Sequence, residues 1–206
     1  MSSNKHESRG AKNRLDIVIS SYAGDAEPAK KALASPDPKS RASALLALHR
    51  LGMLDDRDLE AALDDHDPQV RRRACELTAS YSAISLAKSL ADPDPYVVEM
   101  ALWSSGERAE SRNLEIIRIQ AIEHPESLVR EAAVAALGAI GDPSGLTAIL
   151  AALEDRPNVR RRAAVALAAF EGEQVNQALR KAANDRDWQT RQIAEDLLEI
   201  TEGSVD

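Results

Sequence analysis

The sequence has few aromatic residues, little glycine and a single cysteine. Aromatic residues make up 3% of the 206 residues, and the one cysteine is Cys75. A lone cysteine excludes an intrachain disulfide and fits a reducing compartment, so we expect a cytoplasmic protein. No apolar run reaches the roughly 18 residues that a membrane-spanning helix needs, and residues 1–13 lack the apolar core of a signal peptide. We therefore expect no membrane association.

The residue patterns that support catalysis or metal binding are also missing. The four histidines form no His-x-x-x-His pair and no cluster with the cysteine at metal-ligand spacing. No glycine-rich phosphate loop occurs, and we expect Cys75 to pack near the core rather than act as a reactive thiol. The formal net charge of −8 argues against a general nucleic-acid-binding surface. We therefore expect no catalytic residues, no metal site, no cofactor and no nucleic-acid partner.

One short phrase returns along most of the chain. It is clearest at residues 65–77, which begin Asp-His-Asp-Pro-Gln-Val-Arg, and we align its copies on this arginine. The spacing between successive copies ranges from 27 to 32 residues. The six anchor positions are Arg41, Arg71, Val98, Arg130, Arg160 and Arg191. A period near thirty residues predicts a repeat architecture in which each unit stacks on its neighbours.

The Asp-Pro pair divides each repeat into two helices. Proline keeps the residue before it out of helical geometry, which ends the first helix; such helices are expected, for example, over Leu59–Asp64 and Leu86–Leu90. Asp67 can accept the unpaired backbone N–H groups at the start of the second helix, and Pro68 suits the first position of that helix. The fourth and fifth copies lack this aspartate, so we expect their turns to be less firmly specified.

Within the second helix, a small residue recurs three positions after the anchor. All six copies have alanine there: Ala44, Ala74, Ala101, Ala133, Ala163 and Ala194. At 100° per residue this position shares a face with the residue just before the anchor, which is valine in four copies. We expect both positions to be buried where another helix approaches closely.

These repeats resemble the HEAT repeat, and most closely its short variant in phycobilisome lyase subunits. The best-matching stretch is Val129–Pro143, which reads Val-Arg-Glu-Ala-Ala-Val-Ala-Ala-Leu-Gly-Ala-Ile-Gly-Asp-Pro. The resemblance implies an all-α, right-handed α-solenoid of about six helical hairpins with an N-terminal capping helix, whose second helices line the concave side. We assign residues 1–13 to a disordered tail, 14–25 to the capping helix, 26–201 to a single repeat domain and 202–206 to a disordered C-terminal tail.

The resemblance also bears on individual side chains. In HEAT-like proteins the anchor arginine commonly pairs with an aspartate of the neighbouring turn, and Val98 interrupts that series in the third repeat. One HEAT-fold enzyme family, deoxyhypusine hydroxylase, holds a di-iron site on His-Glu pairs. The equivalent pair here is Arg130-Glu131. We therefore do not expect that activity.

Two positions of each second helix are expected to face the groove: the residue after the anchor and the residue four further on. They lie near 200° and 240° from the buried valine, opposite the core. Trp103 is the strongest candidate, because an exposed aromatic side chain offers a large contact area at low entropic cost. The predicted partner-binding residues are Leu46, Arg72, Glu99, Trp103, Glu131, Arg161 and Val165.

Other conspicuous side chains are expected to be structural. In the arginine triplets at residues 71–73 and 160–162, only the middle arginine is expected to face the groove. Trp188 begins a second helix in the place that other copies give to proline. We expect its side chain to plug the turn.

The sequence predicts a monomeric, non-catalytic scaffold or adaptor that binds a protein or peptide partner on the concave face. The lyase resemblance leaves a second hypothesis, an accessory subunit of an enzyme such as a bilin-lyase-like complex. A third and weaker hypothesis is DNA binding or DNA repair, because a DNA alkylation-repair glycosylase family also uses HEAT-like repeats. The net charge of −8 argues against DNA as the partner.

Overall fold

The computed structural model describes residues 2–203, with side chains described from residue 11 to residue 200. It divides the chain into two compact units, residues 1–89 and residues 90–206, which we call the first and second units. Across the described residues every regular element is a helix, so the prediction of an all-α fold is confirmed. The assignment of residues 26–201 to a single repeat domain stays a prediction; the boundary between the two compact units lies between Ser89 and Leu90.

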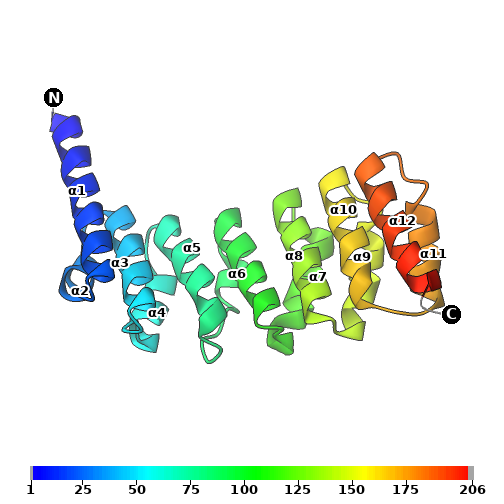
Figure 1. The fold of residues 1–206 in the computed structure, drawn as a ribbon, viewed down its shortest axis with the longest axis horizontal. Coiled ribbons are helices and arrows are strands. Elements are labelled where there is room, and N and C mark those ends of the chain that lie inside the picture. Colours follow the sequence, from blue (N-terminus) through cyan, green and yellow to red (C-terminus); the bar gives the residue numbers. More distant parts are fainter. Residues whose placement is uncertain (1, 204–206) are drawn as a thin grey trace. The chain divides into compact units, whose positions relative to one another are not determined.

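The first unit consists of a terminal helix followed by two helical hairpins (Figure 1). The terminal helix is α1 (Ser2–Tyr22). The hairpins are α2 (Glu27–Ala32) with α3 (Pro38–Arg50) and α4 (Asp56–Leu63) with α5 (Pro68–Leu77), and the 3₁₀ helix η1 (Thr78–Ser80) follows. Because α3 packs against α1, α2 and α5, it is the central helix of this unit.

The second unit begins with α6 (Pro95–Glu107) and continues with three hairpins. These are α7 (Leu114–Glu123) with α8 (Ser127–Ile140), α9 (Leu146–Ala152) with α10 (Pro157–Ala166), and α11 (Glu173–Ala182) with α12 (Trp188–Gly203). The connections include the 3₁₀ helices η3 (Ser111–Asn113), η4 (Pro143–Gly145) and η5 (Leu167–Ala169). α8 packs against both α6 and α10, and α10 also packs against α12.

The third repeat has no first helix, contrary to the expectation over Leu86–Leu90. The segment 81–88 forms turns and irregular structure, and only a short 3₁₀ helix, η2 (Ser89–Ala91), follows it. Leu86 and Leu90 are nevertheless fully buried. The repeat spacing is shortest here, and four serines between positions 80 and 89 offer the backbone alternatives to helical hydrogen bonds. The boundary between the two units falls in this segment.

The terminal helix α1 begins earlier than expected. Its backbone is helical from Ser2, where we expected a disordered tail up to residue 13. The segment has no proline and carries two lysines, one arginine and one alanine, which are good helix formers and can extend a packed helix toward the terminus. In the predicted C-terminal tail, residues 202–203 continue α12, and residues 204–206 lie outside the described residues.

The predicted buried face of the second helices is confirmed. The recurrent alanine is fully buried in all six copies. Cys75, one position further along α5, is also fully buried. An alanine at this place lets a neighbouring helix approach closely, and the same packing solution therefore serves every repeat.

The turns between first and second helices follow the predicted capping pattern. The carboxylate of Asp67 accepts a hydrogen bond from the backbone N–H of Gln69 at 2.8 Å, and Asp37, Asp94 and Asp187 cap their helices in the same way. In the fourth and fifth copies, the capping positions hold Glu126 and Arg156, and neither side chain accepts a capping hydrogen bond. These two turns thus lack the side-chain contact that fixes the others.

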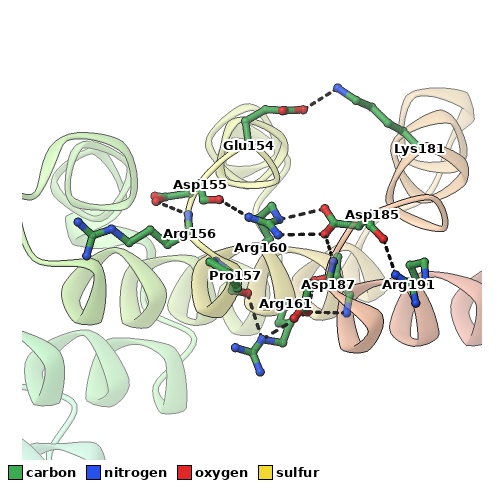
Figure 2. A network of polar contacts seen from close by, with 11 residues as sticks. Glu154, Asp155, Arg156, Pro157, Arg160, Arg161, Lys181, Asp185, Asp187 and Arg191 are labelled. Carbon is green, nitrogen blue, oxygen red and sulfur yellow. Dashed lines mark hydrogen bonds and ion pairs between the residues drawn. The ribbon is translucent and has the colours of Figure 1, made fainter.

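Anchor arginines link successive repeats, as the family resemblance implied. Arg160 donates to both carboxylate oxygens of Asp185, at 2.9 and 3.0 Å, and to the backbone oxygen of Asp155 at 2.7 Å (Figure 2). Arg130 donates to Asp155 at 2.6 and 2.8 Å, and Arg41 pairs with Asp65 in the first unit. Such two-point bonds to a carboxylate fix both distance and orientation. We refer to these pairs as the Arg–Asp ladder.

The ladder is replaced by other contacts next to α6. Val98 takes the place of the arginine, and His124 takes the place of the aspartate in the next turn, so both members of one pair are missing. Gln120 of α7 instead donates to the backbone oxygen of Leu90 at 2.9 Å. At the end of α6, Arg108 and Arg112 both pair with the buried carboxylate of Glu110.

Candidate functional site

The first unit has a hollow of about 420 Å³ between α1, α3 and α5. We call it the basic hollow. Two of the predicted site residues, Leu46 of α3 and Arg72 of α5, line it together. Leu46, with Val18, Ala42 and Ala47, forms an apolar part of the wall. The spacing rule that predicted these two residues therefore places them at one surface.

Positive charge dominates the basic hollow. Five cationic side chains and one carboxylate line it: Arg14, Lys39, Arg50, Arg72, Arg73 and Glu76. Arg14 pairs with Asp37 at 3.1 Å, and Arg73 pairs with Glu76. With five cations against one carboxylate, the lining of the hollow is positive in a chain whose net charge is −8. This local field favours negatively charged groups at this surface.

The second unit has a smaller hollow, of about 230 Å³, around Trp103. We call it the aromatic hollow. Trp103 is 44% exposed. The lining residues come from α6, α8 and α10: Glu99, Trp103, Leu128, Glu131, Ala132, Ala135 and Arg162. Three predicted site residues, Glu99, Trp103 and Glu131, thus lie at one surface, with an apolar floor beside two carboxylates.

Contacts from α10 hold the carboxylate of Glu131 in place. The side-chain amide of Asn158 donates to Glu131 Oε2 at 2.8 Å, and Arg162 lies 3.6 Å from Glu131 Oε1. A group held by neighbouring helices loses little further freedom when a ligand binds. This part of the aromatic hollow is therefore largely preformed.

Val165, the last apolar residue of the predicted series, lines an adjoining hollow of about 380 Å³ between α8 and α10. The two hollows share Ala135 and Arg162, so they are continuous within the second unit. Val165 is 45% exposed. An apolar strip from Trp103 through Ala135 to Val165 follows from these contacts.

Arg161 does not join the other predicted site residues. Its guanidinium forms a hydrogen bond with Gln189, donates to the backbone oxygen of Pro157 at 3.1 Å and lies 3.7 Å from Asp187 (Figure 2). It lines neither the aromatic hollow nor the hollow at Val165. Within the described structure, Arg161 links α10 to the start of α12.

The third arginine of each triplet faces a hollow, contrary to expectation. Arg73 lines the basic hollow, and Arg162 lines the aromatic hollow. The prediction placed the centre of the core near the valine and the alanine. The residue after the alanine is apolar in five copies, and in α5 this residue, Cys75, is buried. Including it moves the centre of the buried face to about 60° around the helix from the valine, and the centre of the exposed face therefore to about 240°. The apolar residue that follows the recurrent alanine was therefore the sequence feature that would have placed both arginines at the exposed face.

Trp188 was expected to plug a turn and is instead 64% exposed. It is the first residue of α12, next to the capping Asp187. The side chain at the first position of a helix lies over the preceding turn, on the outside of the helix end. Trp188 is therefore exposed but lines neither hollow of the second unit described above.

The described residues contain no metal-binding cluster and no membrane-spanning helix. Among them, no group of three or more histidine, cysteine, aspartate or glutamate side chains could hold a metal ion. No described helix is both long and apolar enough to cross a membrane.

Comparisons with known proteins agree with this architecture. The family model described as HEAT repeats matches residues 83–158 and 117–199, which together span more than half of the chain. No curated protein matches the chain. An engineered protein from the Northeast Structural Genomics Consortium is similar in structure, with a TM-score of 0.58 and 19% identity, over 86% of this chain and 96% of the other. A designed armadillo repeat protein has the same TM-score and identity, over 82% of this chain and 96% of its own. The chain belongs to the HEAT-repeat family.

Proposed function

We propose that this protein is a non-catalytic scaffold that binds a protein or peptide partner on the exposed faces of its second helices. Trp103 carries the proposal. Its indole is 44% exposed on a helix whose other large apolar side chains are mostly buried, and it lies beside the apolar side chains of Leu128 and Ala135. Exposed aromatic side chains in preformed hollows are typical anchors of protein interfaces.

The lining of the aromatic hollow suggests which side chain of a partner would bind there. The indole face attracts a cation, and the carboxylates of Glu99 and Glu131 line the same hollow. A lysine or arginine of the partner can stack on Trp103 and pair with either carboxylate. The apolar strip toward Val165 accommodates an adjacent apolar side chain.

The basic hollow of the first unit suits a different segment of a partner. Its cations, among them Lys39 and Arg72, favour an acidic segment, and Leu46 gives that segment an apolar contact. Charge pairs at the rim of an interface mainly raise the association rate and make it depend on salt. We therefore expect binding at this hollow to weaken as the salt concentration rises.

The two tryptophans provide a matched test of the proposal. The tagged full chain is used to capture partners from native lysate, the captured protein is identified by mass spectrometry, and its affinity is measured by calorimetry. We expect Trp103→Ala to weaken binding by roughly tenfold or more, as for a central interface anchor. The control, Trp188→Ala, removes a more exposed indole outside these hollows and should leave the affinity unchanged. Equal affinities for both folded variants would refute the role of the aromatic hollow.

Arg72→Glu tests the basic hollow and bears on the DNA hypothesis. Arg57→Glu is the control, because Arg57 is exposed on α4 and does not line the hollow. If the partner presents an acidic segment, only Arg72→Glu should slow association at low salt. Retention on duplex DNA that only Arg72→Glu abolishes would instead favour the DNA hypothesis. The accessory-subunit hypothesis stays a prediction, to be tested by bilin transfer to an acceptor protein.

A further inference from the structure

The basic hollow gathers hydrogen-bond donors from three helices. Four arginines, one lysine, two serines and one glutamine line its volume of about 420 Å³, against a single carboxylate. All of these side chains except the glutamate can donate N–H or O–H groups. A ligand in this hollow therefore meets many more donors than acceptors of charge, which favours an anionic group with several acceptor oxygens.

Most of the cations lie at one end of the basic hollow. Lys39 is the second residue of α3, and Arg14 pairs at 3.1 Å with Asp37, which caps the start of that helix. Arg72 and Arg73 are the fifth and sixth residues of α5. Because α3 packs against α5 and stacked repeats place equivalent positions side by side, these four cations surround the same end of the hollow.

The middle of the basic hollow is apolar, and its far end holds one more cation. Val18, Leu46 and Ala47 form the wall beyond the clustered cations, and Leu46 is only partly buried. Arg50, the last residue of α3, lies over the ring of Tyr22 at 5.8 Å. A ligand that fills the hollow therefore combines an anionic group with an adjacent apolar group.

Neighbouring carboxylates orient two of the clustered arginines. Arg73 donates through Nη1 to Glu76, and Arg14 donates through Nη1 to Asp37. The two arginine side chains are 32% and 31% exposed. A guanidinium has five N–H donors, so an arginine held through one nitrogen can still donate to a ligand through the others. Donors that are held in this way lose little further freedom when a ligand binds.

A phosphate group fits this cluster better than a run of carboxylates. It brings about 1.5 to 2 negative charges and three acceptor oxygens to one point. Carboxylate side chains bring one charge each and are spaced by about 3.3 Å per residue along an extended segment. Arginine also matches the geometry of phosphate with two parallel N–H donors. Cations that converge at one end of the hollow therefore suit a single phosphate.

The surroundings of the cluster favour a phosphorylated peptide over a nucleic acid. A nucleic acid carries phosphates along its whole length and needs cations at many points. Here the clustered cations give way to Val18 and Leu46, and the chain as a whole has a net charge of −8. Ser43 and Leu46 are about 4.5 Å apart along α3, close to the advance of one residue in an extended peptide.

We propose that the basic hollow binds a phosphorylated serine or threonine of the partner, with an apolar residue beside it. This inference rests on the proposed function, because it names the acidic segment that the first unit binds. The phosphate lies among Lys39, Arg72 and Arg73, and the adjacent apolar side chain contacts Val18 and Leu46. Phosphorylation of the partner then controls its binding to the first unit.

Three fluorescent peptide libraries test the phosphate. They share random flanking positions and carry phosphoserine, glutamate or serine at the centre, and fluorescence anisotropy measures their affinity for the full chain. We expect the phosphoserine library to bind at least about tenfold more tightly than the serine library and about fivefold more tightly than the glutamate library. Arg72→Gln should remove most of this preference. Arg57→Gln, at an exposed arginine of α4 outside the hollow, should retain it.

The outcomes separate this inference from the proposed function. Equal binding of the phosphoserine and glutamate libraries, or equal behaviour of the folded Arg72→Gln and Arg57→Gln variants, overturns the phosphate site. So does the absence of a library preference when duplex DNA or anionic phospholipid vesicles bind in a manner that Arg72→Gln abolishes. Failure of the proposed function has a different signature: a folded Trp103→Ala variant keeps its full affinity for the captured partner, whatever the libraries show.

Sequencing of the phosphopeptides that the chain retains tests the apolar contact. We expect apolar residues beside the phosphoserine to be enriched by roughly threefold or more. Leu46→Ala should lose this enrichment and keep the preference for phosphoserine over glutamate. Met53→Ala, at a residue that is 52% exposed outside the hollow, should change neither. An enrichment that survives in Leu46→Ala would overturn the placement of the apolar residue.

Discussion

The two units share one internal scaffold and differ at their surfaces. The first unit has fourteen lysines and arginines against thirteen aspartates and glutamates, a net charge of +1. The second has twelve against twenty-one, a net charge of −9. The recurrent buried alanine and the Arg–Asp ladder occur in both. The difference shows that stacking constrains the inner positions, while the exposed positions are free to serve separate contacts.

The difference in surface chemistry between the two units is clearest in the basic hollow and the aromatic hollow. The first unit surrounds its hollow with cations, and the second unit combines an exposed indole with two carboxylates. The same positions of the second helix, one and five residues after the anchor, line both. A partner that engages both units therefore needs different chemistry for each of them.

The largest expected effect concerns the contact that replaces the ladder in the second unit. The guanidinium of Arg108 is 3% exposed, and burial lowers its pKa; the carboxylate of Glu110 opposes that change. Glu110→Ala would leave the buried cation without this carboxylate. We expect a loss of about 3–5 kcal/mol in the free energy of unfolding, measured with urea. Glu107→Ala, at an exposed site nearby, should stay within about 0.5 kcal/mol. A loss below about 1 kcal/mol for Glu110→Ala would mean that the contact of Glu110 with Arg108 and Arg112 does not replace the Arg–Asp ladder in this part of the second unit.

The second expected effect depends on how closely helices approach in the second unit. A Cβ atom at Gly138 of α8 would lie 2.8 Å from the Cβ and 2.9 Å from the Cα of Ala166. The corresponding position of the first unit holds His49, whose ring packs 5.8 Å from that of Tyr81. A side chain at Gly138 therefore has to push backbone, and we expect Gly138→Val to cost about 1–3 kcal/mol in thermal melting.

Ala168→Val is the matched control for Gly138→Val. Ala168 holds the position eight residues after the next anchor, in η5 just beyond the end of α10, and it is exposed, so valine there should change the melting temperature little. Equal destabilisation by both changes would show that the stiff valine side chain itself, and not close packing against Ala166, is the cause.

The repeat phrase explains why so much of the fold could be predicted. Asp67 and Pro68 are local signals: each acts on the backbone within a few residues, and the structure confirms the cap that they predict. The buried alanine was predictable because six copies repeat it. The absence of a first helix in the third repeat could not be predicted. Leu86 and Leu90 are buried although they are not in an α-helix, and a pattern of buried residues alone does not specify secondary structure.

The candidate site was predictable only in part. Helical angles placed Trp103, Glu99 and Glu131 at one surface, and the structure brings them together. The same angles failed for Arg161, because a long side chain can reach toward a neighbouring helix and pair there. Contacts of long polar side chains depend on the neighbouring repeat, which the angle within one helix does not describe.

The ladder predicts a pH dependence in both units. In the second unit, the hydrogen bond from Arg130 lowers the pKa of Asp155 below its ordinary value of 3.8. In the first unit, burial is the largest single influence and raises the pKa of Asp65. The hydrogen bonds from Arg41 and from the backbone N–H of Asp67, together with the charge of Arg41, outweigh burial, so the net change is also downward. A carboxylate whose pKa is lowered in the folded state contributes its full stabilisation of the fold when the pH is above its unfolded-state pKa. This contribution is lost as the pH falls through the folded-state pKa.

We therefore expect the stability difference between the wild type and Asp155→Asn to be constant from pH 7 to about pH 5 and to shrink below about pH 4. Asp65→Asn should behave in the same way. Urea unfolding at each pH measures the difference. A difference that grows toward low pH would contradict the direction given for these pKa values.

The smallest expected effect separates the capped turns of the first unit from the two uncapped turns of the second, which hold Glu126 and Arg156 at the capping position. Glu126 has φ −83° and ψ 122°, nearly the backbone geometry of the capping Asp67, with φ −96° and ψ 125°. Only the longer side chain keeps Glu126 from accepting a backbone N–H, so Glu126→Asp should stabilise by about 0.5–1 kcal/mol. Asp67→Ala should cost a similar amount, and Glu123→Asp, before the same turn, should be neutral. Because the backbone at Glu126 already has the geometry of a capping residue, an aspartate there can form the cap. If Glu126→Asp does not raise the melting temperature, the capping hydrogen bond does not contribute to the stability of these turns.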